Sequence, residues 1–586
     1  MQAKHFVNDP TALVVSALQS FRLTNPALSV DVENKILYAP REHGRVSIIS
    51  GGGAGHEPSF TGFVGEGLLT AAVSGTVFAS PSSRQVMSAI ENVDDSKGIM
   101  VLVMNYTGDV LNFGVAIEKA KAAKPALKVE MLVVGDDVSV GRSRAGRVGR
   151  RGIAGTVLVN KVTGAMASAG YDLEDIVRVG RLVTNNLGSI GVSLSRVHVP
   201  GTSKEESKEN RLASDEVELG MGIHNEAGCG RKSGSDAKLP CLLKDMLQQI
   251  LDTDDSERNF LPNHTDKVVL LVNNLGALSA LELGAIALEV VDQLRTQYGV
   301  KVVRVYSGTF MTSLDGAGFS ISLLSLVKTG LKESLTELLD APCNAIGWHT
   351  ISTSGLSNSQ DLNDGHEMPV PVKSESGIES HLDCDLAEIT RRLRAGLGAV
   401  VAAESEITKY DSIVGDGDCG TTLKRGAEGI LAQLTASPSA NIMTLLASIT
   451  SSVESTMDGT SGALYNIFLN SLTHYFKLRA QEATSVDAKF WSCALDVALV
   501  SLQKYTTATV GDRTLMDALI PFITTLRTAD LQSASAAAKK GAEKTTYMRP
   551  GLGRSVYIGN EENWLGKIPD PGAWGLSKLL EGLTQG

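Results

Sequence analysis

Short apolar runs alternate with helical stretches over residues 46–350. The first run, RVSIIS, leads directly into a glycine-rich segment, and residues 266–291 combine an apolar run, a short loop and a long helical pattern. Further apolar runs occupy residues 98–109, 127–137, 300–310 and 319–326. Strands that alternate with helices predict α/β layers with largely parallel sheets.

The pattern changes after residue 351. Residues 352–380 are rich in Ser, Asn, Asp, Gly and Pro and have almost no periodic apolar positions, which predicts a flexible or extended linker. Residues 381–586 show long helical periods, such as LAEITRRLRAGLGAVVAAESEITKY and NIMTLLASITSSVEST, and strand-like runs nearly vanish. They predict an all-helical domain. The expected domains are therefore residues 1–351 and 381–586, joined by this linker.

Composition and charge narrow the class of protein. The 586 residues are 43% hydrophobic and 20% charged, as in ordinary soluble globular proteins. A net charge of −11 argues against a general nucleic-acid binder, which needs a positive face. No apolar stretch reaches the ~18 residues of a membrane span, and the N-terminus has no secretory pattern. Six cysteines without a CxxC pair favour a reducing compartment, so we expect a cytoplasmic protein without a membrane span.

An acidic, glycine-rich segment, DSIVGDGDCGTTL, carries the most specific chemistry. Asp411, Asp416 and Asp418 stand at a predicted helix–loop–helix junction, where three carboxylates repel one another unless cations lie among them. Hard oxygen ligands suit Mg2+, which often bridges carboxylates and nucleotide phosphates, and the spacing does not fit an EF-hand. The alternative is an Asp-Gly turn that only caps a helix.

Other loops at predicted helix starts offer contacts to a nucleotide. MDGTSGALY places Thr460 and Ser461 just before a helix, a natural anion cradle, and VGDRTLMDAL places Arg513 at another helix start. Residues 549–559 and 570–576 are glycine-rich turns. Each alone also fits an ordinary loop, and together they favour a ligand at the rim of one bundle. No Walker A or protein-kinase motif occurs, so a phosphoryl-transfer enzyme would be of another type.

Three segments of the N-terminal half carry candidate substrate groups. GGGAGHEP follows a strand, and His56 stands where a dinucleotide-binding loop needs its third glycine, so a loop that touches a small polar ligand fits better. Asp109 closes another strand, as a general base or as an ordinary turn residue. His224 lies among glycines in MGIHNEAGCG, where a structural or solvated histidine is the alternative. The basic stretch at residues 141–152 favours a solvated surface loop over an anion patch.

Together these segments resemble one family, the ATP-dependent dihydroxyacetone (glycerone) kinases. The shared strings follow the family's order over nearly the whole chain: SGGGAGHEP, GTVFASPS, NYTGDVLNFG, GIHNEAG, GDGDCGTTL, GTSGALY, GDRTLMDAL and DPGA. The resemblance implies a K-type domain of two α/β subdomains with mixed or parallel sheets, followed by an L-type helical barrel. Because both domains share one chain, it also implies ATP with Mg2+ as the phosphoryl donor. A homodimer is implied too, in which the helical domain of one subunit can serve the substrate site of the other.

The resemblance assigns roles to individual residues. His224 matches the histidine that binds the C2 carbonyl of dihydroxyacetone as a hemiaminal, a reaction open to a ketone or an aldehyde but not to an alcohol such as glycerol. Asp109 matches the base that takes the hydroxyl proton, and His56 matches its assisting partner. The substrate-lining positions are Gly53, Ala54, Gly55, His56, Met104 and Asp109. Met104 departs from the family, which usually has a lysine there, so that polar contact is absent or replaced.

On the nucleotide side, Asp411, Asp416 and Asp418 match the ligands of two Mg2+ ions, which neutralise the phosphates and align the γ-phosphoryl group. The nucleotide-binding positions are Asp416, Gly417, Asp418, Cys419, Thr460, Ser461, Arg513, Thr514, Asp570, Pro571 and Gly572. Two loops depart from the family: GRSVY replaces GRASY, and TTATV before GDRT lacks the usual Gly-Pro character. These departures concern the packing of the nucleotide loops and leave the three aspartates intact.

The same scaffold allows other activities. Some relatives also phosphorylate D-glyceraldehyde, and some split FAD into a cyclic flavin phosphate at the same metal site. Other relatives are non-catalytic sensors or regulators. Here the three aspartates and His224 are all present, which favours a kinase over a sensor.

Overall fold

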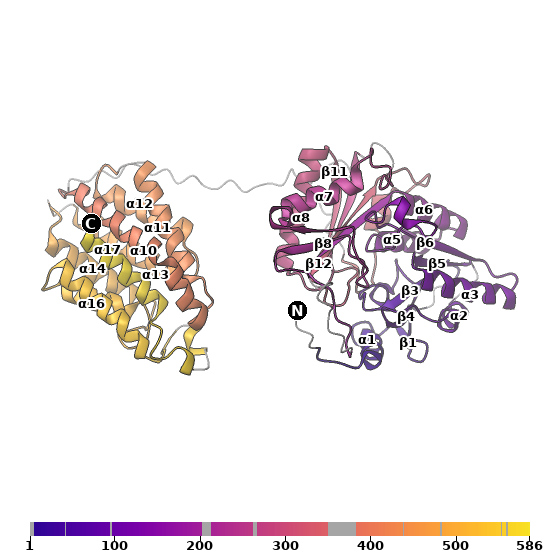
Figure 1. Cartoon of the computed structure of the whole chain (residues 1–586), viewed down its shortest axis with the longest axis horizontal. Helices are drawn as coiled ribbons and strands as arrows, with labels where there is room; N and C mark the ends of the chain where they lie inside the picture. Colours follow the sequence, from indigo (N-terminus) through magenta and orange to yellow (C-terminus); the bar gives the residue numbers. More distant parts are fainter. Residues whose placement is uncertain are drawn as a thin grey trace. The chain divides into compact units, whose positions relative to one another are not determined.

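The chain divides into two units, Met1–Met368 and Pro369–Gly586 (Figure 1). The computed structural model describes residues 5–40, 43–93, 97–201, 212–261, 266–349, 382–436, 439–480, 483, 485–552, 554–557 and 561–586. The predicted linker at residues 352–380 lies outside the described residues.

The N-terminal unit contains two sheets. The first has the strand order β1-β2-β4-β3-β5-β6, in which β4, β3, β5 and β6 are parallel neighbours and β1 and β2 form an antiparallel edge. Its strands are β1 (Ser29–Asp31), β2 (Ile36–Tyr38), β3 (Ser47–Ala54), β4 (Ala71–Val77), β5 (Ile99–Met104) and β6 (Val129–Val134). Ligands commonly bind at the carboxyl ends of such parallel strands.

The second sheet has the order β11-β10-β12-β7-β8-β9 and is antiparallel except for the pair β10 and β11. Its strands are β7 (Leu187–Ser193), β8 (Glu216–Leu219), β9 (Gly230–Ser233), β10 (Lys267–Asn274), β11 (Lys301–Gly308) and β12 (Gly318–Ser325).

Helices cover both faces of the first sheet and both faces of the second. α2 and α3 share an apolar core with one face of the first sheet, α5 and α6 contact its strands from the other, and α7 and α8 contact the second sheet. α5 is buried along nearly its whole length, because it packs in a core that contains strands of both sheets. The helices are α1 (Pro10–Thr24), α2 (Ser83–Asn92), α3 (Thr107–Ala123), α4 (Arg142–Ala145), α5 (Thr156–Ser168), α6 (Leu173–Asn185), α7 (Leu239–Leu251), α8 (Ala280–Tyr298) and α9 (Leu335–Asp340), with 3-10 turns η1 (Thr61–Phe63) and η2 (Gly234–Ala237).

The C-terminal unit is a closed ring of helices. Each helix from α10 to α17 packs against the next, and α17 returns to α10, where Gly582 lies so close to Gly396 that a Cβ on Gly582 would be 2.6 Å from the Gly396 Cα. Apolar faces turn inward around a cavity of about 530 Å3. The helices are α10 (Leu386–Val414), α11 (Cys419–Ala436), α12 (Ile442–Thr456), α13 (Gly459–Arg479), α14 (Ala488–Leu502), α15 (Met516–Leu526), α16 (Leu531–Lys544) and α17 (Pro571–Gln585), with 3-10 turns η3 (Thr545–Tyr547), η4 (Arg554–Tyr557) and η5 (Glu561–Asn563).

The expected fold class is confirmed: an α/β N-terminal half with two mixed sheets precedes a helical barrel. In the part of the chain that the structure describes, no helix has the length and apolar character needed to cross a membrane.

Candidate active site

Two histidines, one following a strand of each sheet, face each other. His56 follows β3 of the first sheet, and His224 lies in the loop after β8 of the second. Their Nε2 atoms are 3.0 Å apart, and their rings meet edge to face with centroids 4.8 Å apart. His56 is fully buried, whereas 20% of the His224 side chain remains exposed. The folding of the two sheets against each other therefore brings together two residues that are far apart in the sequence.

His56 is held from behind by a backbone carbonyl. Its Nδ1 lies 2.8 Å from the carbonyl oxygen of Thr312, in the connection between β11 and β12. Burial and the adjacent His224 lower the pKa of His56 to about 3, so its imidazole is neutral. The carbonyl can only accept a hydrogen bond, so we assign the single ring proton to Nδ1. The Nε2 lone pair of His56 is thereby left facing His224.

His224 is held by a carboxylate. Its Nδ1 lies 3.0 Å from Glu226 Oε1, and its backbone N–H donates to Glu226 Oε2 at 2.9 Å. Burial alone would raise the pKa of Glu226, but the hydrogen bond and charge of His224 outweigh it and lower that pKa to about 2. The ionised carboxylate requires a proton on Nδ1 of His224, and the lone pair of His56 requires one on Nε2. In this assignment both nitrogens of His224 donate, Nδ1 to Glu226 and Nε2 to His56.

Asp109 lies in the first turn of α3 and is buried. Burial raises the pKa of its carboxyl group, while the Ser80 side chain and His224 act in the opposite direction. Its Oδ1 has no hydrogen-bond partner among the described residues. The same holds for the hydroxyl group of Tyr106, whose ring packs edge to face on His224 at 4.8 Å. Buried polar atoms are normally satisfied, so these two atoms are available to a bound ligand.

The glycine loop shapes this region by close approach. A Cβ on Gly53 would lie 2.8 Å from the backbone nitrogen of Ala79, and one on Gly55, where φ is +100°, would lie 2.9 Å from the Phe78 ring. Ala54 between them ends β3. The Phe78 ring consequently reaches both histidines, with centroids 5.3 Å from His56 and 5.2 Å from His224.

Met104 ends β5 and is buried in the core among apolar side chains. It offers no polar group where the family usually has a lysine.

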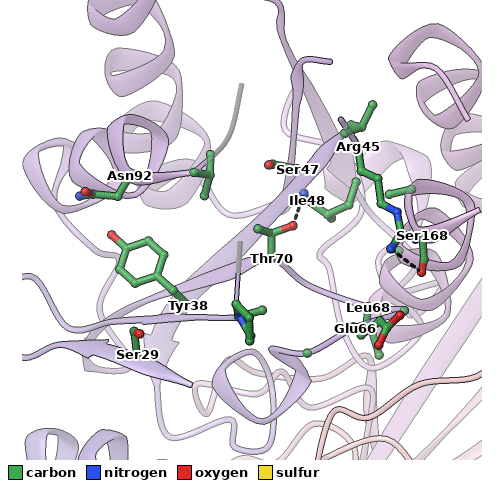
Figure 2. Close-up of a pocket in the computed structure, with 18 of the residues that line it drawn as sticks. Ser29, Tyr38, Arg45, Ser47, Ile48, Glu66, Leu68, Thr70, Asn92 and Ser168 are labelled. Carbon is green, nitrogen blue, oxygen red and sulfur yellow. Dashed lines mark hydrogen bonds between the residues drawn. The ribbon is translucent and has the colours of Figure 1, made fainter. Parts of the chain in front are cut away.

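A separate cavity of about 390 Å3 opens at the other end of β3 (Figure 2). Arg45 Nη1 donates to Ser168 Oγ at 3.4 Å on one side of it, and Thr70 Oγ1 accepts from the backbone N–H of Ile48 at 3.0 Å. The residues that line this cavity include none of the predicted site residues, so the cavity is distinct from the histidine site.

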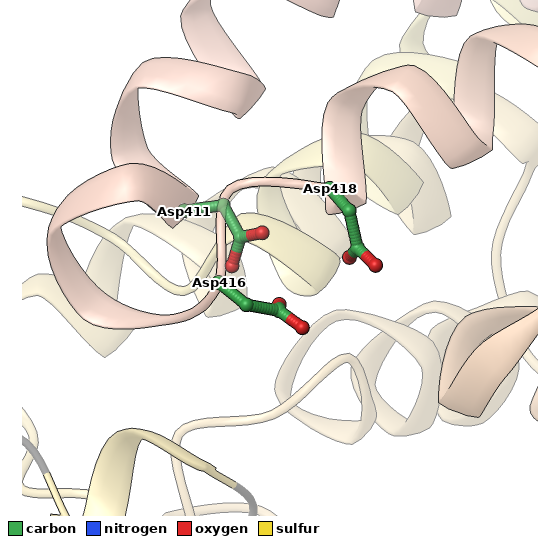
Figure 3. A group of neighbouring side chains, drawn as sticks. All are labelled: Asp411, Asp416 and Asp418. Atoms are coloured by element: carbon green, nitrogen blue, oxygen red, sulfur yellow. The ribbon is translucent and has the colours of Figure 1, made fainter. Parts of the chain in front are cut away.

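In the helical unit, the three aspartates of the acidic loop converge between α10 and α11 (Figure 3). Asp411 is buried in the last turn of α10, and Asp416 and Asp418 are exposed; each offers an oxygen within 4.8 Å of the others. The backbone N–H of Cys419 donates to Asp411 Oδ2 at 2.9 Å. Gly417 has a φ of +83°, which turns the loop back on itself. This set of hard, closely spaced oxygens fits Mg2+.

The amino ends of three helices gather beside this loop. Cys419 begins α11, and burial with the nearby Asp411 and Asp570 raises the pKa of its thiol to about 12, while the Ser461 side chain of α13 hydrogen-bonds to it. Asp570 caps α17: its Oδ1 accepts from the Ala573 N–H at 2.7 Å, and burial raises its pKa to about 6. Pro571 and Gly572 form the first turn of α17, and Thr460 is exposed in the first turn of α13. Helix amino ends favour bound phosphate.

Arg513 is buried and held by the protein itself. Its Nε donates to the Thr545 carbonyl at 3.1 Å, its Nη2 donates to the Ile568 carbonyl at 2.9 Å, and its guanidinium lies 4.7 Å from the Trp564 ring centroid. Its Nη1 has no hydrogen-bond partner among the described residues. Thr514 next to it accepts from the Met516 N–H at 3.2 Å. Direct contact of these two residues with a nucleotide stays a prediction.

Sequence reasoning assigned no role to Glu226, Tyr106, Phe78 or Thr312. Glu226 and Tyr106 lie inside motifs that were recognised, and a carboxylate two residues from a reactive histidine is a usable signal. Phe78 likewise lies in a shared string. Thr312 contacts the His56 ring through its backbone carbonyl, for which no sequence signal exists, and its hydroxyl group donates to the carbonyls of Gly55 and Glu57.

Comparison with known proteins identifies a domain family in each unit. Residues 19–347 match the Dak1 domain and residues 413–585 match the DAK2 domain. The chain is 42% identical to the dihydroxyacetone kinase of Komagataella pastoris, over 100% of this chain and 98% of that protein. It is 35% identical to the triokinase/FMN cyclase of Homo sapiens, over 100% of this chain and 99% of that protein.

A crystal structure of the dihydroxyacetone kinase from C. freundii in complex with AMP-PNP and Mg2+ is also similar, at 31% identity and a TM-score of 0.61, with 100% of both chains covered. Matches of this identity and coverage define a common family, so the chain belongs to the dihydroxyacetone kinase family, with its Dak1 and Dak2 domains fused in one polypeptide.

Proposed function

We propose that this protein transfers a phosphoryl group from ATP to dihydroxyacetone, with the ketone held on His224 as a hemiaminal. The observation that carries the proposal is the hydrogen-bonded chain from Thr312 through His56 and His224 to Glu226, with the two Nε2 atoms 3.0 Å apart. These hydrogen bonds hold His56, a proton acceptor, beside the His224 nitrogen that must attack, and they hold the negative charge of Glu226 behind that ring.

Capture of the ketone moves one proton from His224 to His56 and from there to the substrate. Nε2 of His224 gives its proton to Nε2 of His56, and the freed lone pair adds to C2 of the ketone. His56 returns the proton to the former carbonyl oxygen, which becomes the hydroxyl group of the hemiaminal. The alkylated ring keeps its Nδ1 proton and its positive charge, which Glu226 stabilises. Glycerol has no carbonyl group, so it cannot form this bond.

Asp109 acts as the base in the transfer step. Its unpartnered Oδ1 accepts the proton of a terminal hydroxyl group of the captured triose, whose oxygen attacks the γ-phosphorus of ATP. The bond between that phosphorus and the oxygen that joins it to the β-phosphate breaks, and ADP leaves with the bonding electrons. The raised pKa of Asp109 suits this role, because a stronger base accepts the proton more readily. His56, which moves a proton during the capture step, assists Asp109.

In the helical unit, Asp411, Asp416 and Asp418 hold two Mg2+ ions, which when bound supply charge neutralisation and alignment of the phosphates. The amino ends of α11, α13 and α17 bind the nucleotide through Gly417 to Cys419, Thr460 and Ser461, and Asp570 to Gly572. Arg513 and Thr514 support this region, with Arg513 fixing the segment before Asp570 through the Ile568 carbonyl.

Each region of the chain has its own task in this reaction. Residues 1–351 bind the ketone, residues 352–380 link the domains, and residues 381–586 bind Mg-ATP. The protein acts in the cytoplasm as a homodimer, in which the helical domain of one subunit can serve the other subunit's ketone site.

Two further activities fit the proposed sites, one at the histidines and one at the metal-binding aspartates. D-glyceraldehyde has a carbonyl group that His224 can capture. Cleavage of FAD to cyclic FMN is supported by the similarity to the human triokinase/FMN cyclase. A non-catalytic triose sensor is disfavoured by the three converging carboxylates, since a sensor needs no metal site.

The test compares phosphate transfer to dihydroxyacetone, D-glyceraldehyde and glycerol, and cyclic FMN release from FAD, in wild type and His224→Ala. We expect turnover of both carbonyl compounds to need His224, glycerol to be inactive, and FAD cleavage to survive the substitution. A preference for glycerol, or a fully active His224→Ala variant, would contradict the hemiaminal.

A further inference from the structure

Arg151 lies beneath the loop that carries His224. Its basic segment was predicted to be a solvated loop, and Arg142, Arg144 and Arg147 are indeed exposed. The Arg151 side chain, in contrast, is only 15% exposed and forms an ion pair with Asp137, itself 2% exposed. Arg151 Nε and Nη2 lie 2.9 Å and 2.7 Å from Asp137 Oδ2, and the backbone N–H of Ser139 donates to the other carboxylate oxygen.

This ion pair marks the junction of the two sheets. Asp136 and Asp137 follow β6 of the first sheet, and both backbone N–H groups donate to the Arg151 carbonyl oxygen. Asp137 also bridges to Ser189 in β7 of the second sheet. Because His56 follows a strand of the first sheet and His224 a strand of the second, the geometry of this junction bears on the distance between the histidines.

From the junction Arg151 reaches the His224 loop. Its Nη2 donates to the Gly220 carbonyl at 2.7 Å, where the loop begins. A Cβ on Gly222 would lie 2.1 Å from Glu226 Oε2 and 2.5 Å from Arg151 Nη1, so these two charged groups converge on the space that this glycine leaves open. Burial lowers the pKa of Arg151, but the negative charges of Asp137 and Glu226 are among the influences that outweigh it and raise it.

We infer that Arg151, held by Asp137, is a positioning residue for ketone capture, which fixes both the loop of residues 220–228 and the Glu226 carboxylate that orients His224. This inference rests on the proposed role of His224. The hydrogen bonds of the Arg151 side chain go to Asp137, Ser139 and Gly220, and none goes to a ring of His56 or His224 among the described residues. The planar guanidinium of Arg151 donates to Asp137 and to the Gly220 carbonyl, and Nη1 lies near the Glu226 carboxylate, a spread of contacts that the single ammonium group of a lysine cannot reproduce.

The neighbouring Arg150 provides a matched control. It is partly buried at the same junction, where its Nη1 donates to the carbonyls of Asp136 and Leu187 and its guanidinium lies 4.2 Å from the Phe260 ring centroid. None of these contacts is to residues 220–228. Arg150→Lys therefore keeps the positive charge at the junction and removes no contact to the His224 loop.

The experiment compares Arg151→Lys, Arg151→Met, the double variant Arg151→Met/Asp137→Asn, and Arg150→Lys. The double variant removes both buried charges, so that no charge is left unpaired if the single variants fold poorly. KM for dihydroxyacetone, KM for ATP and kcat are measured on the full chain, with circular dichroism to establish folding. NMR of [2-13C]dihydroxyacetone measures the fraction of bound ketone that is an adduct.

We expect folded Arg151 variants to raise KM for dihydroxyacetone about tenfold or more and to reduce the adduct, with KM for ATP unchanged within about twofold. Arg150→Lys should behave as wild type. The inference is overturned if folded Arg151 variants keep wild-type KM and adduct, if Arg150→Lys shows the same loss, or if no Arg151 variant folds. Absence of an adduct in wild type would instead refute the proposed function, so the two failures are distinguishable.

Discussion

Replacement of Glu226 by glutamine removes one charge and keeps the shape of the side chain. The fall of the Glu226 pKa from 4.5 to about 2 corresponds to roughly 3 kcal/mol of interaction, mostly with His224. About a third of the side chain (35%) is exposed, so solvent screening reduces this to about 2 kcal/mol. The cation on the alkylated His224 ring loses the same stabilisation. Glu226→Gln should therefore weaken ketone capture about 30-fold.

The assay for this prediction is KM for dihydroxyacetone, together with the adduct fraction of [2-13C]dihydroxyacetone and KM for ATP. Glu66→Gln is the control, because Glu66 is exposed and lies outside the histidine site. Glu226→Gln should change KM for dihydroxyacetone and the adduct fraction but not KM for ATP, and Glu66→Gln should change none of the three. A KM for dihydroxyacetone within about threefold of wild type would refute the electrostatic role of Glu226, since it leaves less than about 1 kcal/mol for the charge.

The same substitution has a signature in the pH dependence of stability. The folded-state pKa of Glu226 lies below its ordinary value of 4.5, so the ionised carboxylate contributes stability above about pH 4.5 that is lost as the pH falls towards 2. Thermal unfolding midpoints of wild type and Glu226→Gln should differ at neutral pH and converge over this range. A difference that persists at the acid end would mean that the effect is steric.

Further predictions concern the base, the metal site and the packing of the helical barrel. Asp109→Asn should lower kcat by about 10²–10⁴-fold. It should also remove the acid limb of the profile of kcat against pH, which in wild type lies above the ordinary carboxyl range because burial raises the pKa of Asp109. An unchanged acid limb would remove Asp109 from the mechanism. Asp416→Ala should abolish turnover and weaken Mg2+ binding in calorimetry while leaving the ketone adduct intact; turnover near the wild-type level would contradict the metal assignment. Gly420→Ala should lower the unfolding midpoint, because its Cβ would lie 2.2 Å from Thr408 Oγ1, whereas Gly398→Ala, which meets open space in α10, should raise stability by about 0.5–1 kcal/mol.

The strands that the sequence predicts are those with branched apolar runs. β3, β5, β6 and β10 contain such runs and occur where they were expected. β4 (AAVSGTV) and β7 (LGSIGVS) were not predicted, because alanine, glycine and serine occupy positions that are buried within the sheets. Alanine, glycine and serine have little strand propensity, so only their packing within the sheets explains why these segments are strands.

Site residues were predictable where a motif carries them and not where the fold assembles them. Arg151 stands in a basic stretch that is typical of an exposed surface, and its burial depends on Asp137, which lies 14 residues earlier in the chain and pairs with it at the sheet junction. Arg513 likewise follows a Gly-Asp pair at a predicted helix start, yet its guanidinium packs on Trp564. Sequence reasoning identifies which groups can react, and tertiary contacts decide how they are oriented.

If a ring nitrogen of His224 forms a covalent bond to the ketone, C2 of the bound dihydroxyacetone becomes tetrahedral. NMR of [2-13C]dihydroxyacetone with the full chain, in wild type and His224→Ala, detects this change. Wild type should convert the carbonyl resonance of the bound ketone into one typical of a tetrahedral carbon, and His224→Ala should still bind Mg-ATP without this conversion. A tetrahedral resonance of equal intensity in His224→Ala, or bound ketone that remains trigonal in wild type, would rule out the hemiaminal on His224.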